Sequence, residues 1–477
     1  MKTNSLDFDA QALREKILDL AMRGKLVPQD PNDEPASVLL EKIKEEKAEL
    51  IKEKKIKKTK PLPPITDDEK PFDIPDSWEW VRLGDVIKPE VHKKPTKNFT
   101  YIDIASVDNK KNQIANPNKI NIAKDKIASR ARQELDSNDI LFSVVRPYLK
   151  NIALVPDNDE YKVGSTGFYV LKPFKLISRK YIFYLVLSGY VISKMTQKMK
   201  GDNSPSIRKG DLQGLIIPLP PLSEQSRIAA KIAQLFALLR KVETSTQQYA
   251  KLQTLLKSKV LDLAMRGKLI EQDPNDEPAS VLLEKIKAEK AELIKEKKIK
   301  KTKPLPPITD DEKPFDIPDS WEWVRLGDVG EIFAGGDKPK DYSIIKDEEH
   351  QIPIYSNGIK NKGLYGFTEV ARVFRPAVTL SARGTIGHVE YRSEPFLPII
   401  RLISFVPYDD SYLKCIFYFL QSKQLIEKGD GSSIPQLTVP KLKPKILPLP
   451  PLSEQSRNAA KIAQLLALLR KVETLLK

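Results

Sequence analysis

The stretch DLAMRGKLVPQDPNDEPAS at residues 19–37 returns almost unchanged as DLAMRGKLIEQDPNDEPAS at residues 262–280. It belongs to a longer duplication, because residues 18–86 match residues 261–329 at all but three of 69 positions. A second block, residues 216–244, matches residues 446–474 at all but three of 29 positions. Repeats of this length decide the architecture before any local pattern does, since both copies must fold alike. The sequence therefore predicts two copies of one frame.

The frames enclose two segments of different sequence, residues 87–215 (the first insert) and residues 330–445 (the second insert). Drift after a recent duplication is one explanation, but drift would also have blurred the frames. We therefore favour two inserts with different tasks on one shared frame.

Composition narrows the class of protein. With 477 residues, 40% of them hydrophobic, we expect two to four domains with real cores. The single Cys415 argues against a disulfide scaffold or a cysteine zinc site, and three scattered histidines argue against a histidine metal centre. The longest apolar run, residues 181–193, is too short for a membrane span, and the first ten residues lack a signal-peptide core. With a net charge of +16, we expect a cytoplasmic protein with a polyanionic partner.

The frame contains a long helical pattern at residues 223–267, with Ser223 as its expected N-cap and Gly267 as its expected C-cap. Heptad spacing predicts a helix that packs along another helix, through Ile228, Ile232, Leu235, Leu239, Val242, Thr246 and Tyr249, and after a phase slip Leu252, Leu256, Val260 and Leu263. The second copy is split, because residues 453–477 repeat its first part and residues 13–20 repeat its last part. We expect an antiparallel helix pair in a circular pseudo-two-fold arrangement, with the chain termini close together.

Each frame also carries a charged segment. Residues 38–56 predict a helix with a thin apolar stripe, and residues 42–60 are strongly basic. Contact with nucleic acid and an ordinary solvated helix face both remain open for this charge. Trp78 and Trp80 lead into the first strand of an insert, where we expect core positions.

Both inserts mix short strands, turns and one helix, which predicts a shared α+β fold. We expect strands at residues 101–107, 139–145, 152–155 and 168–171, and at 352–355, 378–382, 388–391 and 399–405. Helices are expected at residues 181–200 and 410–427, each followed by a Gly/Ser/Pro loop at 200–212 and 428–442.

Charge and loop chemistry suggest contacts with DNA. Residues 88–215 hold 23 Lys or Arg and 12 Asp or Glu, a net charge of +11, whereas residues 330–445 hold 16 and 13, a net charge of +3. Cations bind phosphates, and Arg, Lys, Asn, Gln, Ser and Thr read base edges. Candidate contacts, with Arg146 and Arg383 leading, are Lys93, Lys94, Asn98, Tyr101, Ser143, Arg146, Tyr148, Asn203, Ser204, Ser206, Arg208, Lys338, Lys340, Tyr355, Ser356, Asn357, Asn361, Arg383, Thr385, Ser432, Ser433 and Gln436.

Sequence motifs for catalysis are missing. There is no Walker loop, no GxGxxG after a strand, and no Asn-Pro-Pro-aromatic or Asp-Pro-Pro-aromatic tetrad for methylation of a flipped base. The acidic PDNDEYK at residues 156–162 is crowded into one short turn, which favours a surface turn over a nuclease site. These absences weaken an enzyme interpretation and leave it open.

The sequence resembles the specificity subunit of type I restriction-modification systems over essentially the whole chain. The resemblance rests on residues 19–37, PFDIPDSWEWVRLGDV at 71–86 with its twin, GSTGFYVLKP at 164–173, and PLPPLSEQSRIAAKI at 218–232 with its twin. It implies two target-recognition domains that each read half of a split DNA site, with the paired helices setting the gap and partners methylating adenine. It implies two modification subunits with S-adenosylmethionine, two restriction subunits with ATP and Mg, and no cofactor or catalytic site in this chain.

The resemblance divides the chain into seven parts. Residues 1–27 and 448–477 form the split spacer helix, 28–86 and 270–329 form the scaffold helices and linkers, 87–217 and 330–447 form the target-recognition domains, and 218–269 form the central helix. The second domain has SARGTIG at residues 381–387 where the first has SVVRPYLKN at 143–151, as expected for different half-sites. A self-sufficient DNA-modifying or DNA-cleaving enzyme is the alternative, and a coiled coil that binds only proteins is a third.

Overall fold

The structure, a computed structural model, describes residues 9–422 and 436–475. Contacts divide the described chain into a first unit, residues 9–246, and a second unit, residues 247–422 and 436–475. In the described part of the chain, no helix is both long and apolar enough to cross a membrane.

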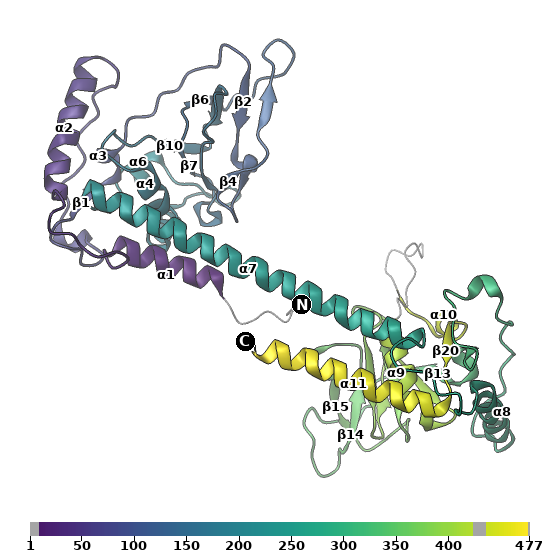
Figure 1. Cartoon of the computed structure of the whole chain (residues 1–477). Helices are drawn as coiled ribbons and strands as arrows, with labels where there is room; N and C mark the ends of the chain where they lie inside the picture. The colour runs from purple at the N-terminus through teal and green to yellow at the C-terminus, as the bar shows by residue number, and fades with distance from the viewer. Residues whose placement is uncertain (1–8, 423–435, 476–477) are drawn as a thin grey trace. The chain divides into compact units, whose positions relative to one another are not determined.

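Each unit contains a pair of antiparallel helices (Figure 1). Helix α7 (Leu222–Met265) gives its first half to the first unit and its second half to the second unit. In the first unit, α1 (Ala10–Met22) runs against it, because Arg14 pairs with Glu243 while Gln29, further along, bonds to Glu224. In the second unit, α11 (Leu452–Leu475) runs against it, with Gln253 Nε2 3.1 Å from Leu469 O. Both predicted parts of the split copy are thus helices that run antiparallel to α7.

The predicted contact stripe of α7 is wrong in its middle. Val242, Leu252 and Leu256 lie more than 40% exposed, whereas Gln253 is buried. The amide of Gln253 binds a backbone carbonyl of α11, so a polar side chain occupies the line that the heptad pattern gave to leucines. Apolar burial is concentrated toward the ends of α7, as at Ile232 and Leu261.

The ends of α7 differ from expectation at one side only. Ser223 is not the N-cap, because the helix begins at Leu222 and Gln225 N donates to Pro221 O (2.9 Å). Its hydroxyl donates instead to Asp33. Gly267 closes the C-terminus as predicted: it has φ +65°, and a Cβ there would lie 2.5 Å from Pro318 Cγ.

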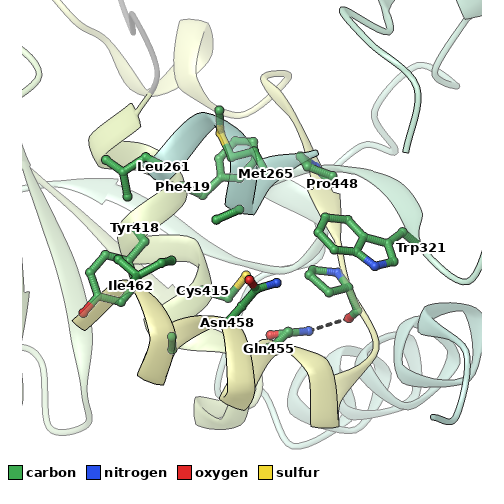
Figure 2. A pocket seen from close by; sticks show the side chains of 13 residues that line it. Leu261, Met265, Trp321, Cys415, Tyr418, Phe419, Pro448, Gln455, Asn458 and Ile462 are labelled. Atoms are coloured by element: carbon green, nitrogen blue, oxygen red, sulfur yellow. Dashed lines mark hydrogen bonds between the residues drawn. The ribbon is translucent and has the colours of Figure 1, made fainter. Parts of the chain in front are cut away.

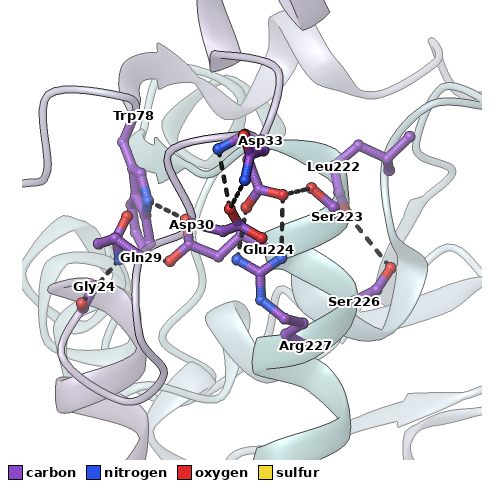
Figure 3. A network of polar contacts seen from close by, with 11 residues as sticks. Gly24, Gln29, Asp30, Asp33, Trp78, Leu222, Ser223, Glu224, Ser226 and Arg227 are labelled. Atoms are coloured by element: carbon purple, nitrogen blue, oxygen red, sulfur yellow. Dashed lines mark hydrogen bonds and ion pairs between the residues drawn. The ribbon is translucent and has the colours of Figure 1, made fainter.

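A polar joint fixes the start of α7 to the frame segment before the insert (Figure 3). Glu224 accepts from the Trp78 indole (2.8 Å) and from the Gln29 amide (2.7 Å), and burial raises the pKa of its carboxyl. Arg227 donates two hydrogen bonds to Asp33 (3.1 and 2.6 Å). The second unit repeats every one of these contacts, with Glu454, Trp321, Gln272, Arg457 and Asp276. Trp78 is a core residue, as predicted.

The charged segments form α2 (Ala36–Lys52) and α8 (Ala279–Lys295), which end four residues earlier than predicted for the first copy. Beyond Lys52 the backbone turns, and Lys54 has a positive φ of 57° that ends the helical path. Ala36, Leu39 and Ile43 are buried, and the lysines lie mostly on the exposed side.

One short sheet closes the frame around each insert. Strand β1 (Glu79–Arg82) pairs antiparallel with β11 (Ile216–Leu219), and β12 (Glu322–Arg325) pairs in the same register with β20 (Ile446–Leu449). Each insert thus leaves the frame and returns to it at neighbouring strands.

The first insert consists of two sheets. One has the order β10-β7-β8-β4-β3, with strands Phe168–Leu171, Ile140–Ser143, Ile152–Leu154, Gln113–Ile114 and Val107–Asp108. The other has the order β5-β2-β9-β6, with strands Asn118–Ile120, Phe99–Ile102, Lys162–Ser165 and Ala131–Leu135. An apolar core that includes Ile102, Leu135, Leu141 and Val170 joins them.

The second insert has the same plan. Its first sheet has the order β13-β19-β16-β17, with strands Gly330–Ala334, Leu402–Pro407, Ala377–Ser381 and Val389–Arg392. Its second has the order β15-β14-β18, with strands Leu364–Thr368, Ile352–Tyr355 and Leu397–Pro398. Strand β14 lies between an antiparallel and a parallel neighbour, as β2 does in the first insert. The predicted shared fold of the inserts is confirmed.

Helices cover the sheets of each insert. The segment predicted as one helix at 181–200 is two, α4 (Arg179–Val186) and α5 (Gly189–Lys198), because Ser188 caps the second one by accepting from Val191 N. In the second insert, the predicted helix begins as a 3-10 turn (Asp410–Tyr412) and continues as α9 (Leu413–Ser422), and its residues 423–427 lie outside the described residues. The short helices are α3 (Leu83–Val86), α6 (Lys209–Gln213) and α10 (Val439–Leu442).

Candidate nucleic-acid interface

Two loops meet at one edge of the first insert: residues 143–150 and 200–208, the first loop pair. Arg146 N donates to Pro205 O (2.9 Å), and Ile207 N donates to Val144 O (3.0 Å). The Arg146 guanidinium also donates to Asn203 O (2.8 Å). These bonds join segments about sixty residues apart and bring together the predicted contacts Arg146, Tyr148, Asn203, Ser204, Ser206 and Arg208.

Arg146 has a left-handed backbone conformation, which residues other than glycine rarely adopt. Its φ is +48° and its side chain is exposed, and Lys150, four residues on, has φ +52°. Left-handed conformations at non-glycine residues are uncommon and are often found at functional sites. One guanidinium donor binds Asn203 O, and the other donors of this exposed side chain are accessible to water or to a ligand.

A basic strip extends the first loop pair. Lys209, which follows Arg208, forms an ion pair with Glu90 and lies 3.2 Å from His92 Nε2. Lys93 follows on the same segment, where its backbone N donates to Arg132 O. Lys93 and Lys94 are both exposed. Lys209 was not among the predicted contacts, and its ion pair joins the 90–94 segment to the loops.

Two candidates of the first insert are buried, and a third lies at a turn between strands. Tyr101 is buried beside Phe99, and Ser143 is 1% exposed with its hydroxyl bound to Val145 O, so neither presents a side chain to a ligand. Both side chains point into the interior of the insert, so neither is a DNA contact. Asn98 is exposed but accepts from Ile122 N at a turn between strands.

The second insert has an equivalent loop pair, residues 381–388 with 436–437. Leu437 N donates to Ala382 O (2.9 Å), the counterpart of the bond from Ile207 to Val144. Asn357 joins them by accepting from Ala382 N (3.1 Å). The predicted Asn357, Arg383, Thr385 and Gln436 therefore come together.

Two features of this second loop pair were missed by sequence reasoning. Arg401 donates to Gln436 Oε1 (3.3 Å), which brings a second arginine to this loop pair. Thr385 Oγ1 is buried without a hydrogen-bond partner among the described residues. The predicted Ser432 and Ser433 lie outside the described residues.

A separate cluster surrounds Lys338. Its ammonium donates to Tyr342 OH (3.1 Å), and it lies over the Tyr342 and Tyr365 rings. The same ammonium lowers the pKa of the Tyr342 phenol. Lys340 is exposed close by in sequence, and Asn361 is exposed in a left-handed turn with φ +48°.

The two interfaces differ in chemistry. The first insert carries a net charge of +11 over residues 88–215, whereas the second carries +3 over residues 330–445. Excess cations favour phosphate binding without regard to sequence. In the described part of the chain, no group of three or more His, Cys, Asp or Glu could hold a metal ion.

Known proteins share this arrangement. A family profile described as the type I restriction modification DNA specificity domain matches residues 75–253 and 318–476. The EcoAI specificity subunit of Escherichia coli is 32% identical over 98% of this chain and 91% of its own length. The EcoEI specificity subunit, also from Escherichia coli, is 35% identical over 68% of this chain and 62% of its own length.

Solved structures agree. The HsdS subunit from Thermoanaerobacter tengcongensis is 26% identical, with a TM-score of 0.52 over 85% of this chain and 92% of its own. A chain from a study of complex assembly and conformational transition in the type I R-M system is 27% identical, with a TM-score of 0.58 over 85% of this chain and 94% of its own. This chain therefore belongs to the specificity subunits of type I restriction-modification systems, the non-catalytic subunits that give these systems their DNA sequence specificity.

Proposed function

We propose that the chain reads a two-part DNA site, with one insert for each half and residues 87–217 and 330–447 as the two reading domains. The observation that carries this proposal is the repeated loop pair. The same backbone bond joins Ile207 to Val144 and Leu437 to Ala382, while the side chains around each bond differ. One geometry with two chemistries fits two different half-sites.

Arg146 is the leading contact of the first half-site. Its free guanidinium donors match the paired acceptors on a guanine edge, a contact that contributes about 1–3 kcal/mol of discrimination. We expect Arg146→Ala to weaken binding of the assembled complex to specific DNA in a gel shift, while assembly with the modification subunit is unchanged. Unchanged specific binding would remove Arg146 from the interface.

Lys93 serves as the matched comparison, because an exposed lysine contacts phosphates as a point charge. Lys93→Ala should lower affinity for all DNA sequences alike and flatten the salt dependence by about one phosphate contact. A sequence-selective loss would assign Lys93 to base reading instead.

Helix α7 and its two partner helices are proposed to set the gap between the half-sites. A helix rises about 1.5 Å per residue, so removing one heptad from both copies shortens each by roughly 10 Å, or about three base pairs. The methylated sites of such a variant should have a gap shorter by that amount. An unchanged gap would contradict the spacer role.

The partners and location follow from the same proposal. Two modification subunits would supply S-adenosylmethionine and methylate adenine, two restriction subunits would supply ATP and Mg chemistry, and the complex would act in the cytoplasm on double-stranded DNA. Mass measurement of the assembled complex tests the stoichiometry. Cleavage or methylation of DNA by the purified chain alone would favour the self-sufficient enzyme instead.

A further inference from the structure

A buried arginine lies between the two sheets of the second insert. Arg392 ends strand β17 and is only 5% exposed. Its Nε donates to Thr379 Oγ1 (3.1 Å), and its Nη2 donates to Lys362 O (2.6 Å). The guanidinium carbon lies 3.6 Å from the centre of the Tyr355 ring. One side chain therefore holds three separate segments.

This arginine has no acidic partner at ion-pair distance in the described part of the chain. Glu390 is on the same strand, but its carboxylate lies 3.1 Å from His388 Nε2 instead. Burial lowers the pKa of Arg392. An uncompensated buried charge destabilises a fold, and the carbonyl and the aromatic face offset part of that cost. If Arg392 served only to stabilise the fold, an uncharged side chain would suffice at this position.

The first insert shows that the charge is not needed for the fold. Arg392 on β17 is the cross-strand partner of Ala377 on β16. In the first insert the corresponding neighbours are Val155 and Asp139, since Val155 N donates to Asp139 O, so Val155 occupies the position of Arg392. Val155 is 1% exposed within the apolar core of the first insert. The same architecture is therefore stable with valine where the second insert has arginine.

Arg392 supports the segment that carries four candidate contacts of the second insert. Residues 355–363 contain Tyr355, Ser356, Asn357 and Asn361, and both Asn361 and Lys362 are left-handed, with φ of 48° and 53°. Such a path persists only where its surroundings hold it. Arg392 holds it at both ends, under the Tyr355 ring and at Lys362 O.

We propose that Arg392 is a positioning residue for DNA reading by the second insert: it fixes the 355–363 segment so that its side chains meet one half-site. This inference rests on the proposed two-part reading. A planar guanidinium suits this positioning role because its N–H donors point in fixed directions, whereas lysine has a single mobile ammonium. The residue itself touches no DNA.

The test is a methylation map made with the assembled complex. Wild-type chain with its modification subunit is used to methylate the DNA of a methylation-free host, and sequencing of the modified bases gives the two-part motif. Arg392→Met should relax one or more positions of one half by roughly tenfold in base preference, and leave the other half unchanged. A merely structural role would lower total methylation and leave the motif as it is.

Arg375→Met is the matched control, because Arg375 belongs to the same insert but pairs with Asp410 at the surface. It should leave both halves of the motif unchanged. If the Arg392→Met complex does not methylate, Arg392→Lys decides, since it keeps the charge and loses the fork; partial relaxation of one half supports the proposal. An unaltered motif in the methylating variant, or equal relaxation of both halves, overturns it. A wild-type complex without a two-part motif overturns the proposed function itself.

Discussion

The two inserts share the pairing of their central strands, but the side chains between their sheets are apolar in the first insert and polar in the second. In the first, Leu141, Ala153 and Val170 lie side by side on neighbouring strands between the sheets. In the second, the equivalent positions are Thr379, Glu390 and Ser404. The Ser404 hydroxyl is buried with no partner among the described residues. The fold therefore does not depend on apolar side chains at these positions between the sheets. The residues there can differ between the inserts, as the two reading surfaces do.

A second contrast lies where each insert rests on the frame. Tyr181 of α4 is fully buried, and its hydroxyl donates to Pro218 O (2.8 Å). The matching α9 sequence, KCIFY for KYIFY, has Cys415 at this position, and a cavity of about 20 Å³ lies beside it (Figure 2). Gln455 Oε1 and Asn458 Oδ1 border the cavity and have no partner among the described residues. That volume holds about one water molecule.

The largest expected effect comes from giving the first unit the residue of the second. Tyr181→Cys removes a large buried ring and the donor to Pro218 O, so we expect the first unit to lose about 3–5 kcal/mol of unfolding free energy. Hydrogen exchange of the whole chain, followed by peptide, separates the two units. Faster global exchange should be confined to peptides before residue 246.

Tyr181→Phe is the control, because it keeps the ring and removes only the hydroxyl. It should lose about 1–2 kcal/mol, the effect of leaving one buried carbonyl without its donor. Equal losses for both variants would mean that the hydrogen bond, and not the packing of the ring, distinguishes the two units.

The frame copies, by contrast, should respond equally to the same change. Glu224 and Glu454 each accept from an indole and an amide. A glutamine there has one acceptor oxygen, and its NH2 would face the other donor. Glu224→Gln and Glu454→Gln should each lose about 1–3 kcal/mol, each in its own unit by hydrogen exchange. Losses that differ by more than the error of the method would contradict the equivalence of the two joints.

Sequence reasoning predicted most of the frame, because near-identical blocks must fold alike and their turns are marked by proline and glycine. It located apolar strands well: Phe168–Leu171 and Ile352–Tyr355 have the predicted bounds. It missed Asn118–Ile120 and Ala131–Leu135, since short strands with exposed polar positions have no apolar run to show them. The break at Ser188 was missed because the flanking apolar pattern continues through it.

The site was predictable in residue type and not in arrangement. Arg146 and Asn203 were both candidates, but their contact depends on hydrogen bonds between distant loops. Tyr101 and Ser143 have side chains that suit DNA contact, but they lie on the buried sides of their strands. Arg392 was missed because a lone arginine in a strand resembles a surface cation until the second sheet is seen to cover it.

A smaller gain is expected from the reverse exchange in the second unit. Asn458→Ile gives the second unit the residue of the first, where Ile228 occupies this position. Removing a buried amide oxygen that has no partner among the described residues should raise the unfolding free energy by about 1 kcal/mol, measured by hydrogen exchange of peptides after residue 246. A loss of stability would show that the site accommodates the amide better than the branched apolar side chain.

The smallest effect concerns the ion pairs of the two joints. Hydrogen bonds from Arg227 hold the pKa of Asp33 below its usual range, and those from Arg457 do the same for Asp276. A lowered folded-state pKa adds stability above the unfolded pKa, near 3.9, which disappears as the pH falls through the folded value. Asp33→Asn should therefore lose up to about 1 kcal/mol at pH 7, with the difference from wild type shrinking below about pH 4. Glu224 titrates in the opposite sense, since burial raises its pKa, so both chains must be compared at each pH. A difference that stays constant down to acid pH would mean that Asp33 acts through shape and not through charge.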